Sequence, residues 1–149
     1  MKDDIYEKIV STLERLGDGY FSGPKSDDLI EKAEFALGVF FPASYKKFLS
    51  NFGCGSIKGV EIYGLIDSDF VNSSVPDAVW VTFEQQKLGL PKKLVVIYST
   101  GYGPVYALDT NKINDDGECP VISYLGENKL EKVADSFAEF LLNELESIE

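Results

Sequence analysis

The stretch that decides the fold is Leu37–Leu65, which reads LGVFFPASYKKFLSNFGCGSIKGVEIYGL. Pro42 suits the first turn of a helix, because its missing N–H would have no intrahelical partner there. After it, Tyr45, Phe48 and Leu49 recur at helical spacing and define one apolar face. The sequence therefore predicts a short helix after Pro42, with one side buried.

The same stretch then changes from helix to strand. Gly53 stands where helices commonly end in a left-handed residue, and Gly55 gives the chain room to turn. Ile57–Tyr63 has the alternating pattern of a β-strand. The stretch is thus a helix–turn–strand unit, and it contains no catalytic group.

Two more helices are predicted before this unit. Apolar residues at helical spacing indicate a helix over residues 5–16, which Gly17 ends. Residues 18–25 form a predicted loop. Asp28 and Glu31 then have the spacing of a capping box, so a second helix is expected to start there.

The second half of the chain is richer in strands. Residues 77–88 fit a helix or a strand, and the flanking Pro76 and Gly89 favour the helix. Leu94–Tyr98 is a continuous apolar run of strand length, typical of a strand in the middle of a sheet.

Two further strands and a final helix follow. Val105–Leu108 and Pro120–Tyr124 are predicted strands, joined by the polar connection 109–118. Ser136 and Glu139 form a capping box for the last helix. Because the strands are grouped, the expected fold is α+β, with N-terminal helices, a mostly antiparallel sheet of about five or six strands, and a C-terminal helix packed on it. Residues 1–149 are expected to form one domain.

The composition is acidic but that of a folded chain. The 149 residues include 44% hydrophobic residues, which argues against disorder. There are 14 basic and 25 acidic residues, a net charge of -11. Such a surface repels phosphate backbones and disfavours direct nucleic-acid binding, whereas it favours a basic partner. Acidic charge also serves solubility, and charge alone does not decide between these interpretations.

The sequence also suggests where the protein works. Cys54 and Cys119 are too few for a disulfide framework, so a reducing compartment is expected. The N-terminus lacks a signal peptide, and no segment has the ~20 apolar residues of a membrane span. These features predict a cytoplasmic protein without membrane association.

Catalytic chemistry has little support in the sequence. The chain has no histidine, which removes the commonest general base and the usual zinc ligand. Cys54, between two glycines, could be an exposed thiol activated by nearby lysines, but a small residue filling a tight turn is the commoner case. We therefore expect no enzyme activity, no cofactor and no metal.

Several motifs together resemble the SUKH superfamily, in its Smi/Knr-like branch. The resemblance covers nearly the whole chain from residue 26 onward, and the motifs occur in the family's order. They are L-x-x-x-x-P-x-x-Y-K-x-F-L at Leu37–Leu49, Y-G-L at Tyr63–Leu65, G-L-P-x-x-L-V-V-I at Gly89–Ile97, leucine-aspartate at Leu108–Asp109, G-E-C-P-V at Gly117–Val121 and A-D-S-F-x-E-F-L at Ala134–Leu141.

The resemblance implies an α+β domain and a non-catalytic role. Bacterial members of the superfamily mostly act as immunity proteins that neutralise a toxin, and many of these toxins are nucleases. Some eukaryotic relatives act instead as regulatory scaffolds in cell-wall signalling, which is the alternative function. An enzyme is the third option, supported only by carboxylates without a defined site.

Charge adds a hypothesis about mechanism. An acidic face would cover a basic cleft of the toxin, which is expected to be a nuclease, by steric and electrostatic occlusion. Tyr102, at a glycine-flanked turn, would add an anchor if its ring is exposed; the alternative is that it folds back onto the sheet. The predicted partner-binding residues are Asp67, Asp69, Tyr102, Asp115, Asp116, Glu118 and Glu127.

Overall fold

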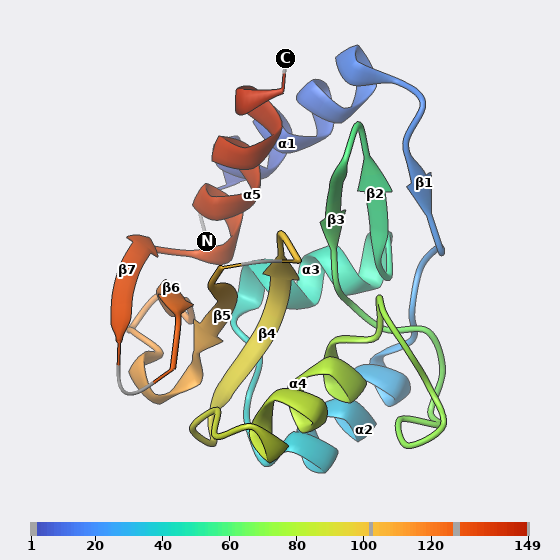
Figure 1. Cartoon of the computed structure of the whole chain (residues 1–149). Coiled ribbons are helices and arrows are strands. Elements are labelled where there is room, and N and C mark those ends of the chain that lie inside the picture. The colour runs from blue at the N-terminus through green and yellow to red at the C-terminus, as the bar shows by residue number, and fades with distance from the viewer. Residues whose placement is uncertain (1–2, 102, 127–128, 149) are drawn as a thin grey trace.

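The computed structural model describes residues 3–101, 103–126 and 129–148 (Figure 1). Within them the helices are α1 (Asp3–Leu16), α2 (Asp27–Leu37), α3 (Ala43–Asn51), α4 (Ala78–Lys87) and α5 (Phe137–Ser147), with a short 3₁₀ helix at Thr110–Lys112. The strands are β1 (Tyr20–Phe21), β2 (Gly55–Ile57), β3 (Val60–Ile62), β4 (Leu94–Ser99), β5 (Val105–Asp109), β6 (Val121–Tyr124) and β7 (Leu130–Ala134).

The strands form two antiparallel sheets rather than the single sheet that the sequence suggested. One sheet has the order β1-β2-β3, and the other has the order β4-β5-β6-β7. The two meet where the Tyr63 N–H donates a hydrogen bond to the Ile97 carbonyl, at 2.9 Å. The α+β class, the antiparallel pairing of strands that neighbour in sequence, and the C-terminal helix on the sheet are confirmed.

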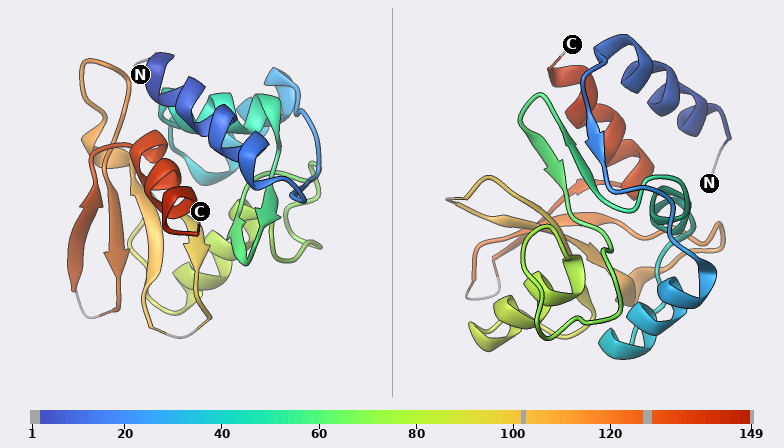
Figure 2. Two further views of the ribbon diagram at one scale, coloured as in Figure 1. Left: turned by 90° about the horizontal axis from the view of Figure 1, so that it is seen from above. Right: turned by 90° about the vertical axis from the view of Figure 1, so that its right-hand side faces the viewer.

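The four-stranded sheet is covered on both faces, which explains the unbroken apolar run of β4. Val95 and Ile97 pack into the cluster shared with α5, whereas Leu94 and Val96 pack into the cluster shared with α4. The right-hand view of Figure 2 shows α5 and α4 on different sides of this sheet. The sequence placed β4 in the middle of a sheet, but it is the first strand of its sheet and lies beside β3.

The predicted helix after Pro42 is confirmed as α3. Pro42 is the N-cap residue, just before the first turn, and the side chains of Tyr45 and Leu49 are fully buried. Gly53 ends the helix with a φ of 78°. A Cβ atom on Gly64 would lie 1.7 Å from the Gly53 carbonyl oxygen, so only glycine fits at that position.

The predicted strand over Ile57–Tyr63 is wrong, because the chain folds back within it. Ile57 pairs with Val60, and the two residues between them form the turn of a β2–β3 hairpin. Lys58 has a φ of 46° and Gly59 a φ of 90°. Positive φ at both central residues is the signature of a type I′ turn, which usually carries Asn-Gly rather than Lys-Gly.

The structure also differs from the prediction at the start of α2 and in two strands that were not predicted. The N-cap of α2 is Ser26, whose hydroxyl oxygen accepts a hydrogen bond from the Leu29 N–H at 3.1 Å; it is not Asp28. β1 lies inside the predicted loop 18–25, because Tyr20 and Phe21 pair with β2. β7 was not predicted, since its first four residues are exposed and show no alternation.

Candidate interaction surface

The first predicted acidic segment is the loop between β3 and α4. Asp67 and Asp69 are both exposed. A carboxylate oxygen of Asp67 accepts a hydrogen bond from the Asp69 N–H at 2.9 Å, and Asp69 in turn accepts from the Asn72 N–H at 3.2 Å. The base of the loop is closed by a parallel bridge between Gly64 and Asp77. The loop therefore presents two carboxylates on a backbone with its own internal hydrogen bonds.

The second predicted acidic segment is the connection between β5 and β6. Asp115 and Asp116 are exposed at its tip. Asn114 organises the turn, because its side-chain oxygen accepts hydrogen bonds from the N–H groups of Asp116 and Glu118. The Ala43 N–H donates to the Gly117 carbonyl at 2.8 Å, so the loop folds back onto the start of α3.

Glu118 does not belong to an exposed acidic face, which corrects its predicted role. Glu118 is only 5% exposed. Its carboxylate accepts hydrogen bonds from the Ser44 N–H at 3.1 Å and the Ser44 hydroxyl at 2.7 Å, and thereby caps α3 from outside. The Ser44 hydroxyl oxygen also accepts from the Ala138 N–H at the start of α5. Glu118 is thus a structural residue that joins three elements.

The two acidic segments do not form one continuous face. The loop that carries Asp67 and Asp69 lies at the right of Figure 1, and the connection that carries Asp115 and Asp116 lies at the left; the left-hand view of Figure 2 agrees. The two predicted residues that remain, Tyr102 and Glu127, lie outside the described residues.

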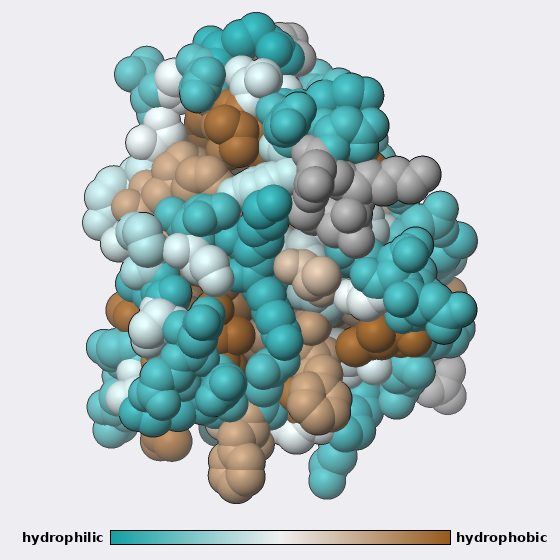
Figure 3. All heavy atoms as spheres, turned by 180° about the vertical axis from the view of Figure 1, so that it is seen from behind, coloured by the Kyte–Doolittle hydropathy of each residue, from teal (hydrophilic) through white to brown (hydrophobic). Residues whose placement is uncertain are grey.

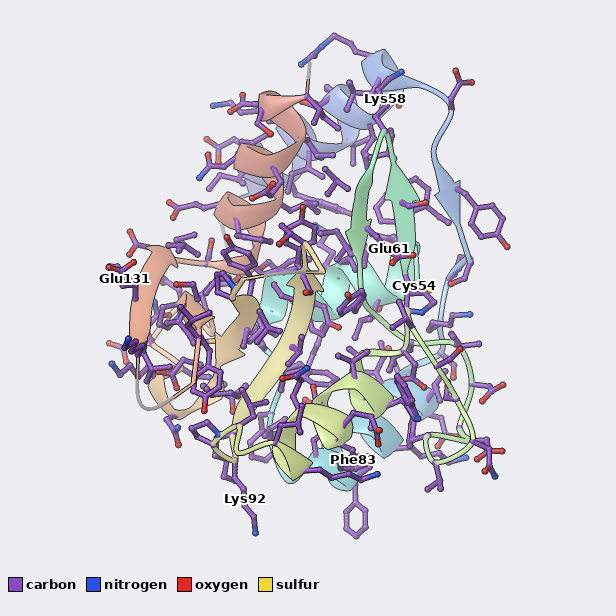
Figure 4. The ribbon with its side chains drawn as sticks, viewed as in Figure 1. Cys54, Lys58, Glu61, Phe83, Lys92 and Glu131 are labelled. Atoms are coloured by element: carbon purple, nitrogen blue, oxygen red, sulfur yellow. The ribbon has the colours of Figure 1, made fainter. Side chains whose placement is uncertain are left out.

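A groove runs between the acidic loop and α4, and we call it the α4 groove. It has a volume of about 460 Å³, and Phe70, Val71, Trp80, Phe83 and Lys87 contribute to its lining. Val71 is strongly exposed, whereas Phe83 is half-buried and packs against the main core cluster; Figure 4 labels Phe83 on α4. The groove therefore lies between the half-buried aromatic side chains of α4 and the loop that carries the exposed carboxylates of Asp67 and Asp69.

A larger groove lies at the end of α2, and we call it the α2 groove. Its volume is about 760 Å³, and its lining includes Phe35, Val39, Phe40, Lys46, Lys93 and Ile113. Seen from behind, apolar side chains are exposed across the lower part of the molecule, where α2 ends (Figure 3).

The local fold forces the two phenylalanines of this groove outward. Val39 and Phe41 are buried, so Phe40 between them faces solvent in the extended segment. The buried carboxylate of Glu34 fixes this segment by accepting a hydrogen bond from the Phe41 N–H at 2.7 Å. Phe35 lies off the buried face of α2 and is 90% exposed. A phenylalanine at a polar position of a predicted helix was the signal in the sequence for this surface.

Both cysteine thiols and the Asp77 carboxylate are buried, and burial raises the pKa of each. Burial raises the pKa of the Cys54 thiol, and burial also raises the pKa of Cys119 to about 12. Neither thiol lies at the surface, so the alternative of an activated Cys54 has no support. Asp77 is fully buried as the N-cap of α4, where burial raises its pKa.

The described residues hold neither a candidate metal cluster nor a candidate membrane span. Residues 3–101, 103–126 and 129–148 contain no group of three or more His, Cys, Asp or Glu that could hold a metal ion. In the same part of the chain no helix is long and apolar enough to cross a membrane.

Comparison with protein families identifies the class. Residues 6–146 match the SUKH_5 family, which is described as SMI1-KNR4 cell-wall. Because the match spans nearly the whole chain, the protein belongs to this family, and the resemblance seen in the motifs is confirmed. Membership supports a role of the toxin-immunity or SMI1/KNR4-like kind.

Proposed function

We propose that this chain is an immunity protein that binds a cognate toxin domain and neutralises it by occlusion. The observation that carries the proposal is the family match over residues 6–146. The net charge of -11 supports a basic partner, because opposite charges favour encounter and orient the partner. A nuclease fits, since its cleft needs positive charge to hold a phosphate backbone.

The proposed mechanism requires no reacting group from this chain. The toxin loses activity because its substrate cannot enter a covered cleft. Asp67 and Asp69 on one loop, and Asp115 and Asp116 on the other, are exposed carboxylates that we propose contact basic side chains of the toxin. Tyr102 and Glu127 remain predicted contacts.

The test starts from the reading frame adjacent to the gene for this chain, where the proposal predicts a toxin domain. The purified domain is assayed on its substrate while the chain is added in increasing amounts, and we expect complete inhibition at stoichiometric ratio. An unrelated protein of similar size and net charge serves as the control for non-specific inhibition by acidic surfaces. Full toxin activity in the presence of excess chain would overturn the proposal.

A regulatory scaffold of the cell-wall-signalling type is the second candidate, and the cell-wall wording of the family description favours it. A scaffold predicts a different result. Deleting the gene would alter cell-wall synthesis, and the chain would leave the toxin of the adjacent frame fully active. The immunity function predicts inhibition of the toxin and no cell-wall change.

A further inference from the structure

The α2 groove carries two large apolar side chains that folding leaves in water. Phe35 is 90% exposed and Phe40 is 76% exposed, and both line the groove together with Ile113. An exposed phenylalanine forgoes the free energy that burial of its ring would provide. Large aromatic side chains grouped around a concave surface are typical of the anchors that dominate protein–protein binding.

The charges around the groove indicate which kind of partner fits. The Lys46 ammonium lies 3.5 Å from the Glu34 carboxylate, and the Lys93 ammonium donates to the Gly38 carbonyl. The ammonium groups of both lysines therefore already contact acceptor groups of this chain.

The carboxylates near the α2 groove favour a basic partner. Glu31 is an exposed residue of the lining, and Asp115 and Asp116 are exposed two and three residues after Ile113. The lining itself carries two glutamates and two lysines, Glu31, Glu34, Lys46 and Lys93. The acidic excess beside the apolar centre comes from Asp115 and Asp116, which follow Ile113, in a molecule of net charge -11. Its complement is an apolar side chain surrounded by lysine or arginine.

We propose that the α2 groove is the main docking site for the basic toxin domain, with Phe35 and Phe40 as its anchors and Asp115 and Asp116 as its electrostatic rim. The inference rests on the proposed function and specifies which of the two acidic segments contacts the toxin. Asp67 and Asp69, on the opposite side of the molecule, then lie outside the interface.

A second copy of this chain is a poorer occupant. Two copies joined through this groove would bring Glu31, Asp115 and Asp116 of each chain toward the same groups of the other. Like charges at an interface oppose association, whereas a basic toxin surface removes that repulsion.

The experiment measures the affinity of a catalytically inactive form of the toxin domain from the adjacent reading frame by titration calorimetry. The double variant F35A/F40A is expected to bind at least about 30-fold more weakly, the loss typical of hot-spot residues. The control is Tyr20→Ala, because Tyr20 is 74% exposed on β1, outside the groove, and its loss should change affinity by less than about twofold. Thermal melting checks that every variant is folded.

A second pair of variants separates the two acidic segments. D115K/D116K is expected to slow association about tenfold or more, and D67K/D69K to leave the rate within about twofold.

Each outcome has a definite meaning. Wild-type chain that does not bind the toxin domain overturns the proposed function, and this inference with it. Wild-type chain that binds, with F35A/F40A binding equally well, overturns the inference alone. A dimer of the free chain that F35A/F40A dissolves shows that a second copy occupies the groove, which also overturns it.

Discussion

Asp77 caps a helix with a carboxylate that burial makes harder to ionise. One carboxylate oxygen accepts hydrogen bonds from the N–H groups of Val79 and Trp80 and so caps α4. The other oxygen is buried and has no partner in good hydrogen-bond geometry among the described residues, although the Ser73 side chain lies near enough to offset part of the effect of burial on the pKa. Burial of the carboxylate disfavours its charged form and so raises the pKa of Asp77, while the hydrogen bonds that it accepts oppose part of this shift.

The raised pKa of Asp77 should make the unfolding free energy depend on pH. A group whose pKa is higher in the folded than in the unfolded state stabilises the fold at low pH, and this contribution is lost as the pH rises from the ordinary value of 3.8 through the raised value. Asp77→Asn keeps an oxygen for the cap and cannot ionise. We expect the unfolding free energy of wild type, relative to Asp77→Asn, to fall across this window, as measured by urea denaturation from acid to neutral pH. A constant difference would contradict the assignment.

The buried carboxylate of Glu118 should contribute to the free energy of unfolding. Its carboxylate accepts two hydrogen bonds from Ser44 in a buried site, and such charge-assisted bonds contribute about 1.5–3 kcal/mol each. Glu118→Ala is therefore expected to lower the unfolding free energy by about 2–4 kcal/mol, and Glu118→Gln by less.

The control for Glu118 is Asp115→Ala in the same loop. Because Asp115 is exposed, its loss should change stability by no more than about 0.5 kcal/mol in chemical denaturation. Equal stability of the Glu118→Ala and Asp115→Ala variants would refute the structural role of Glu118.

Among the elements, the β2–β3 hairpin is the best place to change stability. Lys58 stands at the hairpin tip in Figure 4 and has a left-handed backbone, which costs a lysine about 1 kcal/mol. Lys58→Asn is expected to raise the unfolding free energy by about 0.5 kcal/mol, because asparagine tolerates this conformation. The midpoint of urea denaturation measures the change, with an unaltered m-value.

Gly59→Ala provides the opposite test in the same turn. A Cβ atom there would meet no other atom within 4 Å, so the substitution adds backbone strain without a clash. Its expected cost is about 1 kcal/mol. Stability that responds to neither change would show that the turn differs from type I′.

The elements also show what the sequence could and could not predict. Helix α3 and strand β4 were predictable, because apolar spacing reports burial directly. The hairpin was missed since Lys-Gly is an uncommon pair for a type I′ turn, and β7 was missed because its exposed residues leave no alternation.

The candidate site was harder to predict for a different reason. Charge can be counted from a sequence, but its position depends on how loops fold back. Asp115 and Glu118 are three residues apart, yet one is exposed and the other buried, because the loop returns to the start of α3. Neither Phe35 nor Phe40 was predicted as a binding residue. Phe35 carried a signal, being apolar off the buried face of its helix, whereas the place of Phe40 in the same groove depends on how the chain folds.

For the whole molecule, the net charge of -11 predicts how the proposed complex responds to salt. Electrostatic steering speeds association by about 10- to 1,000-fold and is largely screened at about 1 M salt, where the Debye length is about 3 Å. We expect the association rate with the toxin domain to fall steeply as salt rises, and the dissociation rate to change little. Stopped-flow measurements over a salt series test this, and a salt-independent association rate would contradict steering.

The attachment of the β5–β6 connection to α3 has a consequence for how this protein can evolve. Its base is fastened by the Ala43–Gly117 hydrogen bond and by the Glu118 carboxylate on Ser44, whereas its tip points into water. Mutations at Asp115 and Asp116 can therefore be sampled at little cost to folding. Natural selection is free to change the partner that the tip recognises while the same framework is inherited. Related chains should accordingly diverge at the tip and retain the pair that holds its base.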